Sequence, residues 1–149
     1  MIKRYNLYLH EVANYPYKDE KVTSPASVVR IANDIFHFTK QPEEILGIIC
    51  LNSKGKPVAS FEVSRGTLSS SFFSPREIFK RVITANAQSF LAFHNHPSGD
   101  TTPSASDIES TKELLKGAEI LGLTFHDHII IGSTTTDYLS LRESGYVNF

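Results

Sequence analysis

The sequence predicts an α/β domain in which a mixed β-sheet is sandwiched by helices. Three observations favour this class. Segments with strand-like and helix-like spacing of apolar residues alternate along the chain. Two neighbouring strand-like segments are joined by a short turn, so they predict an antiparallel hairpin in a sheet that is not purely parallel. Serine-proline pairs mark helix starts. The length of 149 residues fits one domain, and we place no boundary within residues 1–149.

The first 23 residues are expected to form a short N-terminal extension. Residues 5–12 alternate between polar and apolar side chains, which predicts a strand. Residues 14–23 are polar and contain a proline, which predicts a loop. Ser24 and Pro25 then supply an N-cap and a proline at the first helical position. The helix is expected to end near residues 38–40, and its apolar stripe consists of Val28, Val29, Ile31, Ile35 and Phe36.

The middle of the chain is expected to contain the hairpin and a second helix. The uninterrupted apolar run Ile45–Leu51 predicts a buried central strand. A turn leads into a second strand at residues 57–64, and a short extended piece is expected around residues 68–73. Residues 74–77 combine a capping box with a helix-starting proline. They predict a helix to about Asn86, whose inward side chains are Ile78, Val82 and Ile83.

The second half is expected to add two strands, one long helix and a short terminal helix. In order, the sequence predicts a buried strand at 89–94, a polar loop at 94–103, a helix from Ser104 that stops at Gly122, and a strand at Thr124–Ile131. A short extended piece at 138–139 and a capping-box sequence at 140–143 then predict a terminal helix to Gly145.

The composition excludes several classes of protein and site. One cysteine rules out an intramolecular disulfide and a multi-cysteine zinc site. Fifteen basic and sixteen acidic side chains give a net charge of −1, which argues against a broad nucleic-acid binder. No apolar run approaches the roughly 20 residues that a membrane span needs. The basic N-terminus lacks a long apolar segment. We therefore expect a cytoplasmic protein without an export signal or a membrane partner, and a homo-oligomer is compatible with the sequence.

Residues 93–107 carry the most informative functional pattern. His94 and His96 stand two apart at the end of a predicted strand, so both imidazoles point the same way. The loop after them is rich in turn-forming residues and returns the chain to Asp107, in the first turn of the next helix. Two imidazoles and one carboxylate suit Zn²⁺. Three protein ligands leave a fourth position for water, as in catalytic zinc sites.

Simpler explanations exist for the same residues. Ser104 and Asp107 have the spacing of a capping box, in which the carboxylate only satisfies the helix start. Histidine is also common in polar loops, so a His-x-His pair by itself is a weak sign of a metal. A hydrolytic zinc site further needs a general base. Glu44, at the start of the apolar strand, is the best candidate, but periodicity does not distinguish it from Glu43 or Glu62.

The spacing of these residues resembles the JAMM motif of the MPN+/JAB metalloprotease superfamily. That motif is His-x-His-Pro followed by Ser-x-x-Asp, with ten residues between the second histidine and the aspartate. The fuller string HNHPSGDTTPSASD, preceded by SPREIFKRVI and followed by DHIIIG, resembles the RadC family of bacterial JAB-domain proteins over about residues 24–147. The resemblance implies the MPN/JAB architecture, which is cytidine-deaminase-like. It also implies that His94, His96 and Asp107 are zinc ligands.

The resemblance extends to the remaining catalytic roles. The run Glu44-Ile45-Leu46-Gly47 matches the superfamily's catalytic glutamate, which implies that Glu44 is the general acid/base. Ser104 is implied to polarise the scissile carbonyl or to hold the oxyanion. The implied function is zinc-dependent hydrolysis of a peptide, isopeptide or other amide bond. The substrate that this predicts is a peptide or another amide.

A second class of function stays open, in which the same fold serves as a DNA-repair-associated accessory or binding protein. Many RadC proteins carry an N-terminal helix-hairpin-helix region, a DNA-binding motif, and residues 1–23 show no such pattern. Nucleic acid as a partner is therefore only weakly supported. A third class, the zinc nucleobase deaminases, needs a Pro-Cys-x-x-Cys pair, which a single cysteine excludes.

A second His-x-His sequence lies in the strand predicted at Thr124–Ile131. Within a regular strand His126 and His128 share a face, while Asp127 points to the opposite face. Two interpretations stay open. Asp127 or His128 supports the metal ligands, as hydrogen-bond partners of ligands commonly do, or these residues have a structural role in the sheet.

Other polar and reactive residues are expected to be structural. Cys50 lies in an apolar run and is expected to behave as a small buried hydrophobe. Asn95 and Ser98 are expected to form turns. A group of basic residues is expected on a solvated face, with a basic patch near the site as the alternative; it consists of Arg65, Arg76, Lys80 and Arg81.

Overall fold

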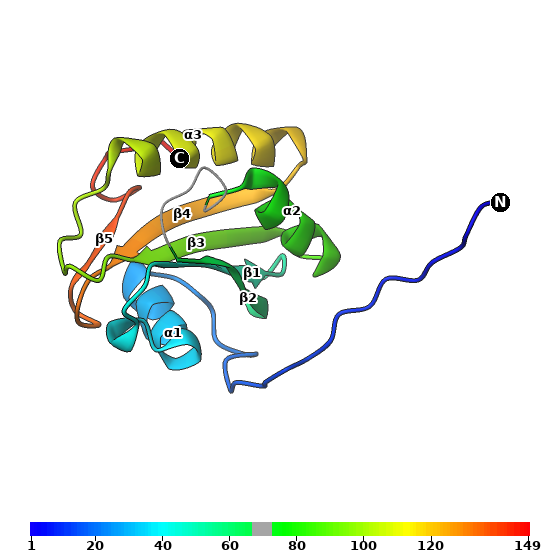
Figure 1. Cartoon of the computed structure of the whole chain (residues 1–149), viewed down its shortest axis with the longest axis horizontal. Helices are drawn as coiled ribbons and strands as arrows, with labels where there is room; N and C mark the ends of the chain where they lie inside the picture. Colours follow the sequence, from blue (N-terminus) through cyan, green and yellow to red (C-terminus); the bar gives the residue numbers. More distant parts are fainter. Residues whose placement is uncertain (67–72) are drawn as a thin grey trace.

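The computed structural model describes residues 1–66 and 73–149 and has the predicted α/β fold. Figure 1 shows one β-sheet with helices on both of its faces. In chain order the elements are α1 (Pro25–Phe36), the 3₁₀ turn η1 (Phe38–Lys40), β1 (Ile45–Leu51), β2 (Pro57–Arg65), α2 (Pro75–Thr84), β3 (Ser89–Asn95), α3 (Ala105–Ile120), β4 (Thr124–Ile131) and β5 (Tyr138–Ser140). The extended piece expected around residues 68–73 falls almost wholly outside the described residues.

The sheet is mixed, as the sequence predicts. Its strand order is β2-β1-β3-β4-β5. The predicted hairpin is β1–β2, and only β3 and β4 among these neighbours run parallel. Parallel neighbours need a crossover connection, and α3 provides it. A short loop therefore brings the N-terminus of α3 beside the carboxyl end of β3 (Figure 1).

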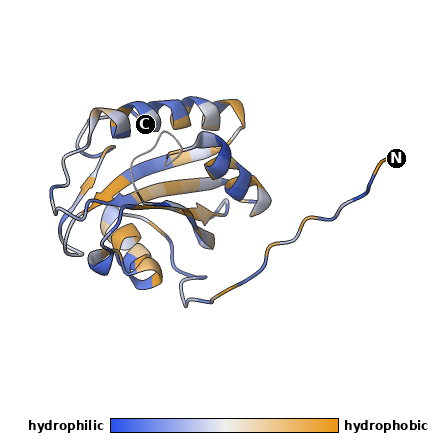
Figure 2. Ribbon diagram, viewed as in Figure 1, coloured by the Kyte–Doolittle hydropathy of each residue, from blue (hydrophilic) through white to orange (hydrophobic). Residues whose placement is uncertain are grey.

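The apolar side chains of the strands fill two cores, one on each face of the sheet. Successive residues of β1 point to opposite faces, and all seven are buried, which explains the uninterrupted apolar run. Figure 2 shows hydrophobic residues on the strands and on α1, which packs against one face of the sheet. The core under α2 and α3 includes Leu46, Ile48, Ile78, Phe79, Phe90 and Leu114. The core under α1 includes Val28, Val29, Ile31, Ile45, Ile49, Phe93 and Ile131.

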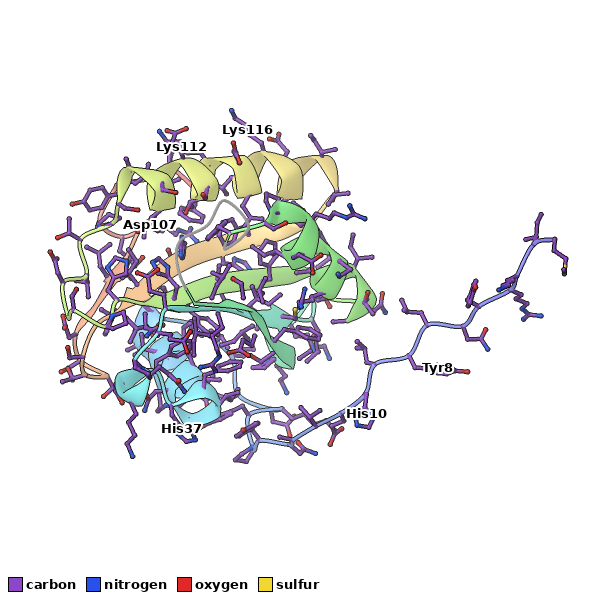
Figure 3. The ribbon with its side chains drawn as sticks, viewed as in Figure 1. Tyr8, His10, His37, Asp107, Lys112 and Lys116 are labelled. Atoms are coloured by element: carbon purple, nitrogen blue, oxygen red, sulfur yellow. The ribbon has the colours of Figure 1, made fainter. Side chains whose placement is uncertain are left out.

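The strand predicted at residues 5–12 is wrong. Residues 1–14 carry no helix or strand and are exposed, and Figure 1 shows this tail extending away from the folded body. Tyr8 and His10 mark the tail in Figure 3. A strand is stabilised by hydrogen bonds to a neighbouring strand, and alternation of side chains does not supply a partner. The extension is attached to the fold further on, where the Val22 backbone N–H donates to the Gly55 carbonyl.

Three of the predicted helices end a few residues earlier than expected. The α1 helix ends at Phe36, and residues 38–40 form the 3₁₀ turn η1. The α2 helix ends at Thr84. The prediction that Ile83 points inward is wrong: it is 55% exposed, because Ile78, Phe79 and Val82 occupy the inward face. The N-cap of α2 forms as expected: the Ser74 hydroxyl accepts from the Glu77 backbone N–H. The α3 helix ends at Ile120, close to the predicted stop.

The terminal helix predicted after residue 140 is wrong, and residues 141–145 form turns. The cap itself forms, since the Ser140 hydroxyl accepts from the Glu143 backbone N–H. Ser140 also pairs with Ile129 as the last residue of β5, so the chain leaves a strand here and then turns. No helix in the described part of the chain is long and apolar enough to cross a bilayer.

Candidate metal centre

Two imidazoles converge at the carboxyl end of β3. His94 lies on the strand and is 1% exposed, and His96 follows directly after it. The His96 backbone N–H donates to the Ile131 carbonyl at 2.8 Å, which continues the pairing with β4 past the end of the strand. The chain therefore stays extended, and the two side chains point the same way. Their Nε2 atoms lie 2.9 Å apart.

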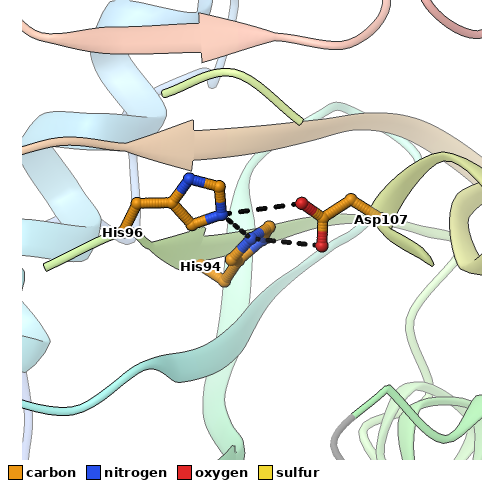
Figure 4. A group of neighbouring side chains, drawn as sticks. All are labelled: His94, His96 and Asp107. Atoms are coloured by element: carbon orange, nitrogen blue, oxygen red, sulfur yellow. Dashed lines mark hydrogen bonds and ion pairs between the residues drawn. The ribbon is translucent and has the colours of Figure 1, made fainter. Parts of the chain in front are cut away.

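Asp107 completes this group from the first turn of α3. Its Oδ1 lies 3.5 Å from the Nε2 of His94, and its Oδ2 lies 3.5 Å from the Nε2 of His96. Figure 4 shows the three side chains directed at one point between them. In Figure 3, Asp107 faces the sheet, whereas Lys112 and Lys116 extend from the outer side of α3.

Asp107 is a helix cap as well as a member of this group. The Asp107 backbone N–H donates to the Ser104 hydroxyl at 3.0 Å, and the Ser104 backbone N–H donates to Asp107 Oδ2 at 2.9 Å. This capping box is one of the simpler explanations that the sequence left open. It fixes the carboxylate toward the histidines, so the two interpretations of Asp107 are compatible.

The spacing of the three side chains fits a metal ion. For a tetrahedral ion with bonds of about 2.0–2.1 Å, neighbouring ligand atoms lie about 3.3–3.4 Å apart. The observed separations of 2.9, 3.5 and 3.5 Å are close to this value. One nitrogen from each histidine and one carboxylate oxygen can together hold a cation.

The hydrogen-bond polarity also favours a cation. His96 Nδ1 lies 2.6 Å from the Asp100 carbonyl oxygen, which can only accept, so Nδ1 carries the proton and the lone pair is on Nε2. Burial by itself raises the pKa of Asp107, but its close contacts with His94 and His96 hold it well below its usual range. An ionised carboxylate and an imidazole lone pair therefore face one another across the site.

Glu44 and Ser104 line the same open pocket, which has a volume of about 310 Å³. His96 and Asp107 also line it, and the rim is formed by Pro97, Ser98, Asp100 and Thr102. Among the described residues, Glu44 Oε2 is buried and accepts no hydrogen bond. A buried carboxylate oxygen without a partner is costly, so it marks a place where a bound group donates to Glu44. The candidate catalytic residues are thus brought together.

A family model agrees with this arrangement. The model of the RadC-like JAB domain matches residues 22–146, which include both histidines, Asp107 and Glu44. This chain belongs to the RadC-like JAB domain family. The resemblance in the sequence is therefore confirmed, and so is the fold class that it implies.

Curated relatives support the same family. A UPF0758 protein of Caldanaerobacter subterraneus subsp. tengcongensis is 41% identical over 128 residues, which are 86% of this chain and 53% of the relative. One from Clostridium botulinum (strain Alaska E43) is 38% identical over 130 residues, 87% of this chain and 55% of the relative. One from Staphylococcus haemolyticus is 42% identical over 126 residues, 85% and 54%. The chain spans about half the length of the curated relatives it matches.

Asn95 has a role in this RadC-like JAB domain that the sequence did not indicate. The prediction that it forms a turn is wrong, because it is buried as the last residue of β3. Its Oδ1 accepts from the Ile45 backbone N–H at 2.7 Å, and its Nδ2 donates to the Glu43 carbonyl at 2.9 Å. The amide thus holds the backbone on both sides of Glu44. The only signal in the sequence is its position between the two histidines.

His128 contacts His94, one of the three candidate metal ligands His94, His96 and Asp107 that together are called the metal group. Asp127 is directed elsewhere. His128 Nε2 lies 2.7 Å from His94 Nδ1, and His128 Nδ1 lies 2.6 Å from the hydroxyl of Thr111 on α3. Asp127 Oδ1 accepts from the backbone N–H groups of His128 and Arg142, and its Oδ2 accepts from Ser140. Through these hydrogen bonds, Asp127 holds the turn after β5 to strand β4.

A bulge in β4 explains why strand alternation alone places His128 poorly. Phe90 pairs with Phe125, but Ala92 pairs with His128, so two residues of β4 oppose one of β3. The regular alternation on which the predicted shared face of His126 and His128 depends is interrupted there. Phe125 and His128 consequently both lie on the α3 side of the sheet, where Thr111 meets His128.

The predictions for Cys50 and for most of the basic residues agree with the structure. Cys50 is fully buried, and burial raises the pKa of its thiol to about 12, which suits a small hydrophobe and not a nucleophile. The basic residues do not line the pocket. Arg65 pairs with Glu62, and both Lys80 and Arg81 pair with Glu77. These pairs favour the solvated face over the basic patch.

Proposed function

We propose that this domain is a zinc-dependent hydrolase that cleaves a peptide, isopeptide or other amide bond with an activated water, and that it works in the cytoplasm. The observation that carries the proposal is the convergence of His94, His96 and Asp107 at a pocket that Glu44 also lines. Among the described residues, one buried carboxylate oxygen of Glu44 has no hydrogen-bond partner. Hydrolytic metal catalysis needs a metal site and a nearby general base, and these residues can supply both.

Zinc is the ion that this donor set fits best. Two imidazole nitrogens and a carboxylate oxygen form a typical three-ligand catalytic zinc set. His94, His96 and Asp107 would hold the ion, and the three leave a further coordination position open to the pocket. When bound, zinc would lower the pKa of its water to about 7 and polarise a carbonyl.

The chain's own groups supply the proton transfers and the orientation. Glu44 accepts a proton from the attacking water and delivers it to the leaving amine, since it lines the pocket and, among the described residues, one of its carboxylate oxygens has no hydrogen-bond partner. The Ser104 oxygen accepts from the Asp107 N–H, which leaves its own hydroxyl hydrogen for the substrate carbonyl. The Asn95 amide holds the backbone on both sides of Glu44 through its bonds to the Ile45 N–H and the Glu43 carbonyl.

The alternative, a DNA-associated binding module, has less support. The net charge is −1, and three of the four basic residues considered are paired with carboxylates. A protein that only binds DNA also has no need for a half-buried carboxylate beside a candidate metal site.

The first test is metal content. The purified protein is expected to hold about one zinc per chain, and His96→Ala is expected to lose most of it, because one of three ligands is gone. His126→Ala is the matched control, since His126 lies outside the ligand group, and it should keep the metal. Full zinc retention in both His94→Ala and His96→Ala would falsify the metal site.

The second test separates the base from the ligands. A peptide and isopeptide screen with and without chelator identifies a cleavable substrate. Glu44→Gln should then keep zinc and fold but lose turnover by about 100-fold or more. Glu43→Gln, whose side chain does not line the pocket, should stay active. Zinc loss in Glu44→Gln means that Glu44 is a ligand, and unchanged hydrolysis means that the base lies elsewhere.

A further inference from the structure

A buried chain of hydrogen bonds joins two of the three ligand residues behind the metal group. His94 Nδ1 lies 2.7 Å from His128 Nε2, and His128 Nδ1 lies 2.6 Å from Thr111 Oγ1. The Thr111 hydroxyl in turn donates to the backbone carbonyl of Asp107 at 2.7 Å. His94, Thr111 and His128 are each at most 1% exposed, so water does not compete for these bonds.

The direction of every bond in this chain follows from its last member. The Asp107 carbonyl can only accept a hydrogen bond, so the Thr111 hydroxyl donates its single hydrogen to this carbonyl. Thr111 must then accept from His128, which puts the His128 proton on Nδ1 and leaves a lone pair on Nε2. That lone pair accepts from His94 Nδ1.

We propose that Thr111 and His128 are positioning residues that hold His94 in the tautomer with its proton on Nδ1 and its lone pair on Nε2, facing His96 and Asp107. This inference rests on the metal site of the proposed function. His96, the other histidine, is held in the same tautomer by the hydrogen bond of its Nδ1 to the Asp100 carbonyl. His94 has a ring nitrogen as its partner, which can donate or accept, so an additional group must set the direction. Thr111 is that group.

The alternative arrangement shows why the direction matters. If the His128 proton were on Nε2, it would donate to His94 Nδ1 and force the His94 proton onto Nε2. That proton would point at His96 and Asp107, where a metal ligand needs a lone pair. Thr111→Val keeps the shape of the side chain but removes the hydroxyl, so it abolishes the bias between the two arrangements.

The first experiment measures tautomers by imidazole ¹⁵N chemical shifts in metal-free protein at mildly alkaline pH. The chain has six histidines, and single substitutions assign their signals. The wild type is expected to show His94 and His128 both protonated on Nδ1. Thr111→Val is expected to show a mixture of tautomers at both rings, and Thr111→Ser should match the wild type. A wild-type His94 that carries its proton on Nε2 overturns the inference, whether or not the variants fold.

The second experiment measures zinc affinity by competition with a chelator. Loss of a group that orients a ligand typically weakens metal binding by about 10–100-fold, and we expect at least about 10-fold for Thr111→Val. Thr111→Ser should stay within about 3-fold of the wild type. Thr84→Val is the matched control, because Thr84 makes the same bond to the carbonyl four residues before it, in α2. It should change neither zinc affinity nor tautomers.

These outcomes separate the inference from the proposed function. If the wild type binds no zinc, the proposed function fails, while the tautomers of the metal-free protein still decide the inference. If the wild type binds zinc and Thr111→Val keeps both the zinc affinity and the tautomers, Thr111 has only a structural role. In that case the inference fails and the proposed function stands.

Discussion

At the scale of single residues, the site depends on amide and imidazole groups whose partners are backbone atoms. The Asp100 carbonyl orients His96, and the Asn95 amide holds the peptide groups on both sides of Glu44. Backbone partners of this kind do not depend on the identity of the residue that offers them. They therefore leave no pattern in the sequence, and only the folded chain shows them.

Asn95→Ala is expected to displace the Glu44 carboxylate and so reduce turnover, while the zinc content stays unchanged. It leaves the buried Ile45 N–H and the Glu43 carbonyl unpaired, so unfolding should become easier by about 1–3 kcal/mol. A shift of the Glu44 carboxylate by about 1 Å can reduce turnover about 100-fold. Zinc content, thermal unfolding and hydrolysis rate are measured on the same protein.

Asn52→Ala provides the control for Asn95. The Asn52 side chain likewise makes two hydrogen bonds to the backbone, because its Oδ1 accepts from the N–H groups of Lys54 and Lys56, but it does so in the β1–β2 turn. Its loss should reduce stability and leave the rate per folded molecule unchanged. Equal rates in the Asn95 and Asn52 variants would contradict a role of Asn95 in positioning Glu44.

At the scale of elements, the carboxyl end of β3 and the N-terminus of α3 build the metal group together. The parallel β3–β4 pair requires a crossover connection, which α3 provides. A loop places the N-terminus of α3 beside the carboxyl end of β3. The capping box of α3 then places Asp107 against the histidines. One local motif thus stabilises the helix and supplies a candidate metal ligand.

Ser104 can be tested for both of its roles. As an N-cap, Ser104→Ala should cost about 1 kcal/mol of stability, and Ser104→Asn should nearly restore it because asparagine also caps helices. As a donor to the substrate oxyanion, Ser104 should matter about 100-fold in rate, and the longer asparagine should not restore it. Zinc should be retained in both variants. If Ser104→Asn recovers stability and rate together, Ser104 is only a cap.

Gly47 in β1 is required by its neighbour on β3. A Cβ at this position would lie 2.3 Å from the ring of Phe93, which is fully buried in the core under α1. Gly47→Ala is therefore expected to destabilise the fold by about 1–3 kcal/mol in denaturant unfolding. Phe93→Leu makes room, so the double variant should lose less than the sum of the single variants. Additive losses would show that the contact is not the cause.

At the scale of the whole molecule, a nearly neutral surface frames an acidic pocket. The net charge is −1, and Glu44, Asp100 and Asp107 all line the pocket. Such a surface does not attract phosphates over a long range. The basic side chains Arg65, Lys80 and Arg81 lie in local ion pairs outside the pocket.

This charge distribution predicts weak binding to DNA. The domain should bind mixed-sequence duplex DNA no tighter than about 1 μM at physiological salt, in the range of non-specific contacts. Fluorescence anisotropy at several salt concentrations measures both the affinity and its salt dependence. A dissociation constant in the nanomolar range would favour the DNA-associated function over the hydrolase.

The sequence by itself determined the fold class, most element bounds and the residues that could form the metal group. Amphipathic spacing, serine caps and the His-x-His sequence are local signals, and the interactions behind them act within a few residues. The predictions of a strand at residues 5–12 and of a helix after residue 140 were wrong. A strand needs a partner strand, and residues 5–12 have none among the described residues. The second segment follows directly on the pairing of β5 with β4, after which the chain turns.

Only the tertiary structure decided how the site is assembled. The convergence of Glu44 with the candidate metal ligands on β3 and α3 joins residues far apart in the chain, and the β4 bulge that brings His128 to His94 interrupts the regular alternation. Thr111 and Asn95 contribute through hydrogen bonds to backbone and ring atoms of other elements. The physical reason is that such bonds depend on distance and direction in space, which the packing of helices on the sheet sets and no local spacing of residues encodes.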